Sequence, residues 1–389
     1  MMLTAKSAST NLMRSLQPVM SVISIALAGA ATAACIGSLP VSPELAPPTG
    51  TFAMPSAWQV ETTSPMGATP SWDGADKIFV RTLDWLLEID ARSGSVLWQE
   101  ASPSDGRMSL PVQVLGDYLA SAEKGSSVAV FSIHHRRPLW RSPVLQTALN
   151  HQLTENIEGI LLTEDNAFVT RFDQKLTTYS LSSGMVLWEA TLPGRTFPYL
   201  ATDGVNVFVA AGTTLRAYEG PTGVTLWERT DLGYAGPLLH EAGTLFIIDE
   251  GRSALSALEA TTNTFLWTTD LEAVSDFEIE CLATSEDLVF VASEEIVAVS
   301  KNNGAVQWVS DQLGRAGCPV VLGQVVYVSS ARNAVFALNA STGEPEGMIR
   351  SGFSTTASQH HPIRGPLVTD SLVVIPIDEY HLVAYGPSR

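Results

Sequence analysis

The feature that most constrains this sequence is a tryptophan that recurs about every 40 residues. The copies are Trp58, Trp98, Trp140, Trp188, Trp227, Trp267 and Trp308, with gaps of 40, 42, 48, 39, 40 and 41 residues. Four positions before all but the first stands a turn residue: Gly94, Arg136, Gly184, Gly223, Asn263 and Gly304. Glycine and asparagine tolerate the left-handed backbone that a tight hairpin needs. The sequence therefore predicts a fold built from similar units of this length.

Each unit contains short apolar runs separated by turn residues, as expected for four β-strands. In the unit that ends at Trp227, Asp203-Gly204 separates the first run from the second, and Thr222-Gly223 separates the third from the fourth. Four-stranded units of roughly 40 residues are typical of β-propeller blades, which stack around a central channel. We expect the contacts between blades to supply most of the stability, because each buried aromatic side chain removes about 150–250 Å² from water.

The number of blades follows from the two ends of the repeat. A seventh copy has Gly347 in place of the tryptophan, and an eighth stops after Tyr385, before its own turn and tryptophan. Trp58, conversely, belongs to an outer strand that has no blade before it. We therefore predict an all-β, eight-bladed β-propeller over residues 56–389, closed by pairing of the N-terminal strand with the last blade. Seven blades with a stray N-terminal strand are the alternative.

The first 35 residues have the composition of an export signal. Lys6 and Arg14 supply positive charge, a short apolar run covers 19–31, and small residues follow. That run is too short for a membrane span, which needs about 20 apolar residues. Residues 36–55 are rich in proline and almost uncharged, a composition that stays extended. We interpret 1–35 as a signal and 36–55 as a tether.

The end of the signal has two interpretations. Small residues followed by Cys35 resemble a bacterial lipobox, with Thr32 where leucine is usual, and Cys35 would then be acylated. Resemblance to lipoprotein sorting signals in that case implies the outer membrane, because Ile36 rather than aspartate follows the cysteine. The alternative is cleavage after Ala33 or Ala34, which leaves Cys35 unmodified in a soluble periplasmic protein.

The overall charge limits the partners of this chain. It carries 40 acidic against 22 basic residues, a net charge of −18, which repels phosphate backbones and excludes nucleic acid binding as its main activity. With 45% hydrophobic and only 16% charged residues, it is also unlike a disordered chain or a coiled coil. The expected partners are neutral or basic.

One motif gives the repeat its closest likeness to a known family. The pattern Ala217-x-Glu219-x-x-Thr222-Gly223-x-x-x-Trp227 resembles the PQQ-like propeller repeat, and this resemblance covers about residues 57–389. Together with the export signal and the tether, it makes the chain similar to the BamB family, lipoproteins of the outer-membrane β-barrel assembly machinery. The resemblance implies a non-catalytic scaffold without a cofactor, bound to the outer membrane by its lipid and facing the periplasm. Its implied partners are proteins, among them the barrel-inserting subunit.

The same resemblance nominates a partner-binding loop after the fourth tryptophan. Leu192 and Arg195 match the leucine and arginine that this family uses there, although the loop is shorter here. The acidic loop expected after Trp227 is reduced to 231–233. An arginine beside an exposed leucine suits a small hot spot; an ordinary surface loop is the alternative. The insertion at 146–158 is a second candidate for partner contact.

Two other functions stay open. A PQQ-dependent dehydrogenase uses this repeat to hold a quinone and Ca²⁺, but such enzymes are usually longer and carry a vicinal cysteine pair, which this chain lacks. We also find no calcium-loop spacing of oxygen ligands and no nucleophile motif. We therefore expect neither an enzyme nor a metal site. The other open function is a periplasmic propeller that senses or binds a small ligand.

The remaining cysteines and the paired histidines have structural interpretations. Cys281 and Cys318 occupy the same register in successive blades, and an even pair in an oxidising compartment suggests a disulfide. We favour two buried thiols, because adjacent inner strands could hold the Cα atoms beyond the bridging limit of about 7 Å. His134-His135 is expected in a solvated turn, and His360-His361 in a loop near the channel mouth.

Overall fold

The computed structural model describes residues 56–66, 68–102, 110–123, 127–143, 157–171, 173–194, 199–271, 281–310, 313, 316–330, 334–350 and 365–386. They belong to the second of two compact units, Ala46–Arg389. The segments interpreted as signal and tether, 1–35 and 36–55, lie outside the described residues. No helix among the described residues has the length and apolar character needed to cross a membrane.

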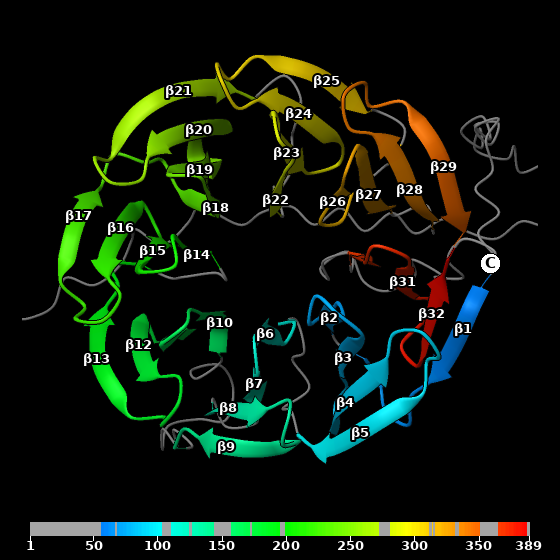
Figure 1. The fold of residues 1–389 in the computed structure, drawn as a ribbon. Helices are drawn as coiled ribbons and strands as arrows, with labels where there is room; N and C mark the ends of the chain where they lie inside the picture. Colours follow the sequence, from blue (N-terminus) through cyan, green and yellow to red (C-terminus); the bar gives the residue numbers. More distant parts are fainter. Residues whose placement is uncertain are drawn as a thin grey trace, which may run out of the picture. The chain divides into compact units, whose positions relative to one another are not determined.

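The second unit consists of eight antiparallel four-stranded sheets that follow one another around a ring (Figure 1). Blade 1 contains β2 (Ser71–Trp72), β3 (Lys77–Arg81), β4 (Trp85–Asp90) and β5 (Val96–Ala101). Blade 2 contains β6 (Gln113–Leu115), β7 (Tyr118–Glu123), β8 (Ser127–Ser132) and β9 (Arg137–Arg141). Blade 3 contains β10 (Ile157–Leu162), β11 (Asn166–Arg171), β12 (Lys175–Ser180) and β13 (Val186–Thr191). Blade 4 contains β14 (Leu200–Thr202), β15 (Asn206–Ala211), β16 (Thr214–Glu219) and β17 (Thr225–Arg229).

The other four blades follow the same order, from the innermost strand to the outermost. Blade 5 contains β18 (Ala235–Glu241), β19 (Thr244–Asp249), the 3-10 helix η1 (Glu250–Arg252), β20 (Ala254–Glu259) and β21 (Thr264–Asp270). Blade 6 contains β22 (Cys281–Thr284), β23 (Leu288–Ala292), β24 (Ile296–Ser300) and β25 (Val306–Ser310). Blade 7 contains β26 (Val320–Leu322), β27 (Val325–Ser330), β28 (Ala334–Asn339) and β29 (Pro345–Arg350). Blade 8 contains β30 (Leu367–Val368), β31 (Val373–Pro376), β32 (His381–Tyr385) and β1 (Ser56–Glu61).

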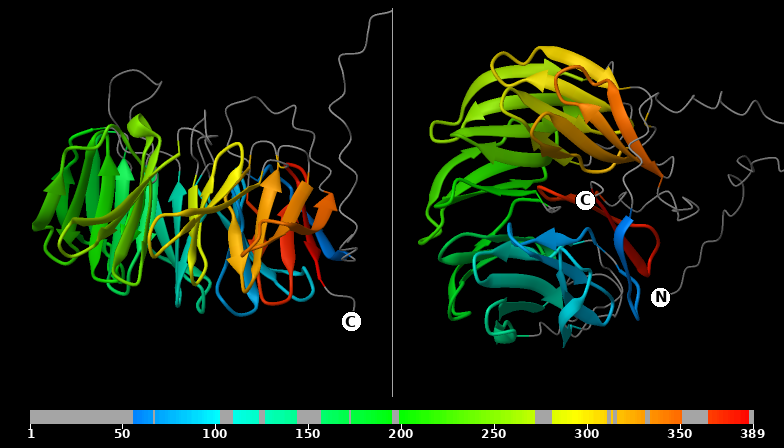
Figure 2. Two further views of the ribbon diagram at one scale, coloured as in Figure 1. Left: turned by 90° about the horizontal axis from the view of Figure 1, so that it is seen from above. Right: turned by 45° about the vertical axis from the view of Figure 1, so that its right-hand side comes forward.

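The alternation of antiparallel strands gives the ring two faces (Figure 2). Turns from first to second strand and from third to fourth strand lie on one face, which we call the turn face; 203–205 and 220–224 of blade 4 are examples. The described parts of the connections from second to third strand, and from one blade to the next, lie on the other face. We call it the loop face, and 212–213 and 230–234 belong to it.

The N-terminal strand closes the ring. Strand β1 pairs antiparallel with β32, so that Ser56 lies opposite Tyr385 and Trp58 opposite Ala384. Immediately after β1, the backbone N–H of Thr62 donates to the carbonyl of Tyr380 at 2.7 Å. The eight-bladed prediction is confirmed, and the seven-bladed alternative is wrong.

The loop of blade 8 that receives this segment is stabilised by Asp378. Its carboxylate accepts hydrogen bonds from the backbone N–H groups of Tyr380 and His381, both at 2.7 Å, and contacts the His381 ring. Burial acts to raise the pKa of Asp378, but these hydrogen bonds outweigh it and hold the pKa below its usual value. The carboxylate is therefore ionised at neutral pH and organises the loop at the closure.

The repeat tryptophans fix each blade to the next. Six indole N–H groups donate at 2.7–2.9 Å to a carbonyl in the last turn of the following blade: Trp58 to Ala91, Trp140 to Leu181, Trp188 to Gly220, Trp227 to Ala260, Trp267 to Lys301 and Trp308 to Ala340. The predicted turn residues all have positive φ, including Arg136 at 52° and Asn263 at 60°. A Cβ on Gly223 would lie 2.5 Å from Trp188 Cδ2. Glycine is thus favoured there both by its backbone conformation and by the indole packed against it.

A β-bulge precedes the tryptophan position in every outer strand. In β13, Trp188 lies opposite Thr178 and Val186 lies opposite Tyr179, which leaves Leu187 between them without a partner residue. A bulge bends and twists its strand. It thereby helps to turn the indole toward the next blade, and it also disturbs an edge that could otherwise pair with another chain.

The hydrophobic core is divided into eight clusters, one between each pair of neighbouring blades. Phe208 of β15 and Ile247 of β19, for example, meet between blades 4 and 5. The buried contacts expected between blades are present, and their contribution to stability stays a prediction. Between blades 7 and 8, where Gly347 replaces the tryptophan, aliphatic side chains pack with Tyr327 and Tyr385. Blade 8 takes its outer strand from the other end of the chain, so it offers no continuous turn on which an indole could dock.

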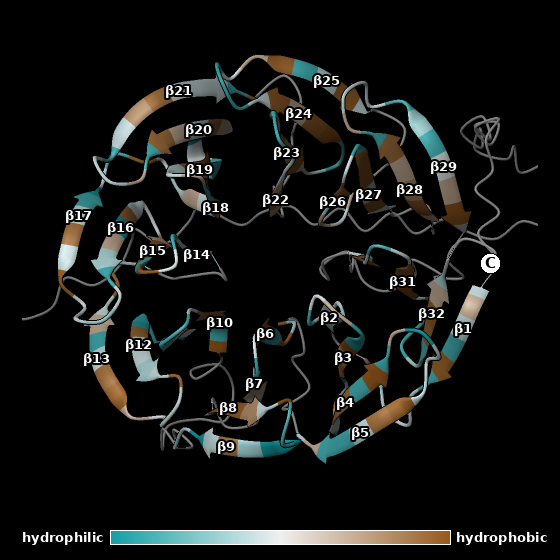
Figure 3. Cartoon of the chain, viewed as in Figure 1, coloured by the Kyte–Doolittle hydropathy of each residue, from teal (hydrophilic) through white to brown (hydrophobic). Residues whose placement is uncertain are grey.

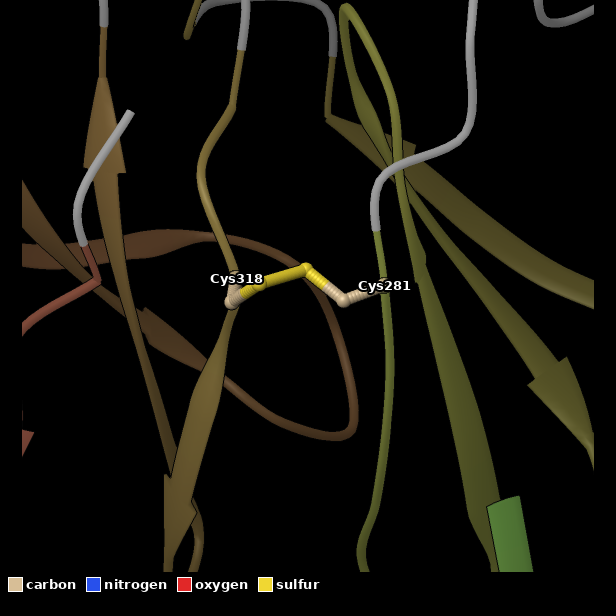
Figure 4. The surroundings of a disulfide bond; sticks show 2 residues. All are labelled: Cys281 and Cys318. Carbon is tan, nitrogen blue, oxygen red and sulfur yellow. A yellow bond between two sulfur atoms is a disulfide. The ribbon is translucent and has the colours of Figure 1, made fainter. Parts of the chain in front are cut away.

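The preference for two buried thiols is wrong. Cys281 and Cys318 form a disulfide with a Cα–Cα distance of 5.5 Å, within the range that a bridge can span (Figure 4). Cys281 begins β22 and Cys318 lies just before β26, so the bond joins the innermost strands of blades 6 and 7. Cys318 is also exposed rather than interior. The innermost strands of adjacent blades come closer together than their register in the sequence indicates.

Replacing both cysteines by serine is expected to lower the free energy of unfolding by about 2–4 kcal/mol, because the bond restricts the unfolded chain. The two residues are 37 positions apart in the sequence. Urea denaturation of the oxidised protein, the reduced protein and the Cys281→Ser/Cys318→Ser variant would measure the effect. The variant should resemble the reduced protein; equal midpoints for all three would contradict the prediction.

Candidate protein-interaction site

The structure describes one of the two residues nominated for partner binding and buries it. Leu192 is only 1% exposed and packs in the cluster between blades 3 and 4, so the expectation of an exposed leucine is wrong. Its backbone N–H donates to the carbonyl of Gln174 at 2.7 Å. Arg195 lies outside the described residues. The Leu192 side chain therefore does not provide a hot spot.

Leu192 belongs to a repeated structural position. A leucine four or five residues after the tryptophan is buried in four blades: Leu192, Leu232, Leu271 and Leu313. The N–H of Leu271 donates to the carbonyl of Ser253, as that of Leu192 does to Gln174. These leucines anchor the connections between blades into the core. The recurrence in the sequence was a signal that would have identified Leu192 as structural.

Asp249 organises a cluster of loops on the loop face of blades 4 and 5. This buried carboxylate accepts hydrogen bonds from the N–H groups of Gly233, at 2.9 and 3.0 Å, and of Tyr234, at 3.1 Å. Arg252 Nη1 lies 3.3 Å from Asp249 Oδ2. The N–H of Glu250 donates to the carbonyl of Tyr234 at 2.7 Å. The segment after Trp227 is thus held against η1.

Close backbone contacts extend this cluster toward blade 3. A Cβ on Gly194 would lie 2.9 Å from the Cα of Gly212, and the N–H of Ala235 donates to the carbonyl of Gly212 at 2.6 Å. A Cβ on Gly251 would lie 2.6 Å from the carbonyl carbon of Gly233. Glycines thus allow the connecting segments of blades 3, 4 and 5 to lie side by side. We call 192–194, 212–213, 230–234 and 250–252 the loop cluster.

The loop cluster presents residue types that are common at protein interfaces. The side chain of Arg252 is 58% exposed, and that of Asp231, which pairs with Arg229, is 64% exposed. Tyr234 is half-buried, and the half-buried Tyr199 places its hydroxyl 3.4 Å from Glu250 Oε1. Tyrosine and arginine are enriched among residues that dominate binding energies. Arg252 and Tyr234 were not identified from the sequence, because only the long-range contact through Asp249 brings them together.

The other candidates from the sequence are distributed as follows. His134 and His135 lie in an exposed turn, as predicted, with ring centroids 4.8 Å apart. Residues 146–156, His360 and His361 are outside the described part of the chain. Among the residues that the structure describes, no group of three or more His, Cys, Asp or Glu side chains is arranged to hold a metal ion.

The fold and its tryptophan contacts define an eight-bladed β-propeller of PQQ-like repeats. A family model described as outer membrane protein assembly factor BamB matches residues 46–269 and 211–385. Because these ranges cover most of the chain, the protein belongs to that family. Compared by sequence with curated proteins, the chain has no match.

Solved structures with low sequence identity share the fold. BamB from Moraxella catarrhalis aligns with a TM-score of 0.63 and 16% identity, over 85% of this chain and 99% of that chain. The computationally designed Ika8 protein aligns with a TM-score of 0.68 and 13% identity, over 85% and 99%. Quinohemoprotein alcohol dehydrogenase from Comamonas testosteroni aligns with a TM-score of 0.65 and 10% identity, over 86% and 77%. At these identities the alignments show the fold, which scaffolds and enzymes share.

Proposed function

We propose that this protein is a non-catalytic cell-envelope scaffold that binds protein partners in outer-membrane β-barrel assembly. The observation that carries the proposal is the match of the family model across nearly the whole propeller. The loop cluster supports it, since it joins an exposed arginine to half-buried tyrosines on a rigid ring. In the proposed function the loop cluster docks on the barrel-inserting subunit of the assembly machinery.

Affinity purification from detergent-solubilised membranes tests the function directly. The tagged protein should recover the barrel-inserting subunit in amounts that follow the bait. Its absence from the purified material would contradict the proposal and favour a sensor or ligand-binding propeller. Quinone-dependent dye reduction with alcohols or sugars would contradict the non-catalytic part.

Arg252→Ala is expected to reduce recovery of the partner about tenfold, because an exposed interface arginine is a frequent hot spot. Quantitative immunoblotting of the purified complex would measure the loss. Arg92→Ala removes an exposed arginine from the turn face of blade 1 and serves as the matched control. Equal recovery with both variants would exclude Arg252 from the interface, and Arg252→Lys separates charge from bidentate geometry.

We further propose that Cys35 is acylated and that 36–55 tethers the propeller to the outer membrane. Labelled palmitate should enter the wild-type protein and not the Cys35→Ser variant. Equal labelling of the two, or no labelling of the wild type, would contradict acylation of Cys35 and favour a soluble periplasmic protein.

A further inference from the structure

Large apolar side chains are exposed along the outer strands of blades 3, 4 and 5. They stand one to three positions before the repeat tryptophan, and Met185 is the most exposed of them at 67%. We call these residues the apolar rim: Met185, Val186, Leu187, Val224, Leu226, Phe265 and Leu266. In Figure 3, β13, β17 and β21, the outer strands that carry these residues, each contain a hydrophobic stretch. Contiguous exposed apolar surface on a soluble protein commonly marks an interaction site.

Contacts between blades make the rim continuous. The indole N–H of Trp188 donates to the carbonyl of Gly220 at 2.7 Å, which brings the start of β13 against the turn that precedes Val224. From β17, the Arg229 guanidinium lies 4.0 Å from the ring centroid of Phe265 on β21. The outer strands of these three blades are therefore linked through side chains that lie in the rim or next to it.

The charged residues in the described turns beside the rim are all carboxylates. In blades 3–5, the described turns on this face and the strand ends that flank them contain no lysine or arginine. Their carboxylates are Glu164, Asp165, Asp203, Glu219, Glu241 and Glu259. Burial acts to raise the pKa of Asp203, but hydrogen bonds from Asn206 and Val205 outweigh it and hold the pKa below its usual value. Asp203 is therefore ionised at neutral pH.

Two cations offset part of this charge. Lys301 of blade 6 pairs with Glu241, and Arg229 pairs with Asp231 at 3.1 Å and donates to Asn263 in the last turn of blade 5. Glu219 and Glu259 accept hydrogen bonds from the neutral hydroxyls of Thr222 and Thr262. Neutral donors hold the carboxylates in place without cancelling their charge.

Blade 1 shows that exposed apolar residues on an outer strand are not always accompanied by turns that carry only carboxylates. Val96 and Leu97 stand at the same two positions before the tryptophan and are also exposed. The adjoining turns of blade 1, however, include the cationic Arg92, and Lys77 begins the next strand. Compared with blade 1, blades 3–5 therefore combine the apolar rim with an excess of carboxylates.

From this juxtaposition we propose that the apolar rim is a second docking surface, which binds a partner polypeptide segment whose apolar residues are flanked by lysine or arginine. The apolar residues of the segment cover the rim, and its basic residues meet the carboxylates of the turn face. The rim lies on the outer strands beside the turn face, and the loop cluster lies on the loop face, so the scaffold has separate surfaces for two partners. The inference goes beyond the proposed function and does not require it.

Two synthetic peptides test the inference on the purified protein. Both contain the same central run of valine, leucine and threonine; one has two lysines at each end and the other has two glutamates. Fluorescence anisotropy should show saturable binding of the lysine peptide at one site per chain, and at least tenfold weaker binding of the glutamate peptide. Raising the salt from 0.05 to 0.5 M should weaken the lysine peptide several-fold, because salt screens the charges. Equal affinities for the two peptides would overturn the proposal.

Three variants locate the binding. Leu187→Ser/Leu226→Ser should weaken the lysine peptide at least tenfold, since each buried leucine contributes about 1.5–3 kcal/mol. Glu164→Gln/Asp165→Asn should weaken it several-fold and reduce its salt dependence. The matched control Val96→Ser/Leu97→Ser should bind like the wild type. Wild-type affinity in both rim variants, or an equal loss in the control, would overturn the assignment.

Two further measurements distinguish peptide binding at the rim from binding at the loop cluster, self-association and lipid binding. Arg252→Ala should leave peptide binding unchanged, because Arg252 belongs to the loop cluster and not to the rim. The proposal for the rim and the proposal for the loop cluster are therefore tested separately. Sedimentation should show a monomer that still binds the peptide, and vesicles of anionic lipid should not compete. Self-association through the rim, or competition by the vesicles, would contradict a protein segment as its occupant.

Discussion

Trp58→Ala is expected to lower the free energy of unfolding by about 3–5 kcal/mol, the usual cost of truncating a buried tryptophan. Trp58 is buried, its indole donates to the carbonyl of Ala91 at 2.8 Å, and it packs against Gly94. It also holds β1 on the ring, so the loss acts where the two ends of the chain meet. Urea denaturation followed by tryptophan fluorescence and circular dichroism would measure it.

Gln59→Ala is the control for this effect, because the side chain is exposed on the same strand. It should stay within about 0.5 kcal/mol of the wild type. A Trp58→Ala protein as stable as the Gln59→Ala protein would show that closure of the ring does not depend on this indole.

Arg136→Ala is expected to cost about 3–5 kcal/mol, because it removes the main partner of a buried carboxylate. Arg136 Nη2 lies 3.0 Å from Oε1 of Glu88, and its Nε donates to Oε2 at 3.3 Å. Glu88 is fully buried in blade 1, and Lys77 lies 3.9 Å away. The neighbouring exposed residue gives a control, and Arg137→Ala should change stability by less than about 0.5 kcal/mol.

Reverting both positions to the pattern of the repeat should rescue stability. Where blade 1 has Glu88, blades 4–8 have alanine, and most blades have glycine where blade 2 has Arg136. Arg136 has φ of 52°, a conformation that glycine adopts at no steric cost. Glu88→Ala/Arg136→Gly should therefore lie within about 1 kcal/mol of the wild type. A double variant that loses as much as Arg136→Ala would show that this pair is not the cause.

The blades could be predicted because their requirements are local. One hairpin requires both a turn residue such as Gly223 and, four positions later, a tryptophan such as Trp227. The same pair of residues recurs from blade to blade, which makes the pattern easy to recognise in the sequence. The closure by β1 followed from the same pattern, because the missing last strand and the additional first strand are complementary.

The wrong or missing predictions concern residues whose surroundings depend on the distances between blades or between loops. The register of Cys281 and Cys318 was visible, but their Cα separation depends on how closely the innermost strands approach each other. Leu192 was assigned to the surface by family resemblance, whereas its position after the tryptophan is one that the repeat buries. Arg252 joins the loop cluster through Asp249, a contact between segments that no local pattern connects.

Engineered crosslinking tests the central claim that the N-terminal strand completes the eighth blade. Glu61 lies opposite His381 in the β1–β32 pair, so Glu61→Cys/His381→Cys, with Cys35 replaced by serine, places two thiols on neighbouring strands. Mild oxidation should give an intramolecular crosslink, visible as faster migration on a non-reducing gel. The control pair Glu61→Cys/Glu228→Cys, with the second cysteine in blade 4, should not crosslink. Absence of a crosslink in the first pair, or equal crosslinking in both, would contradict a ring closed by β1.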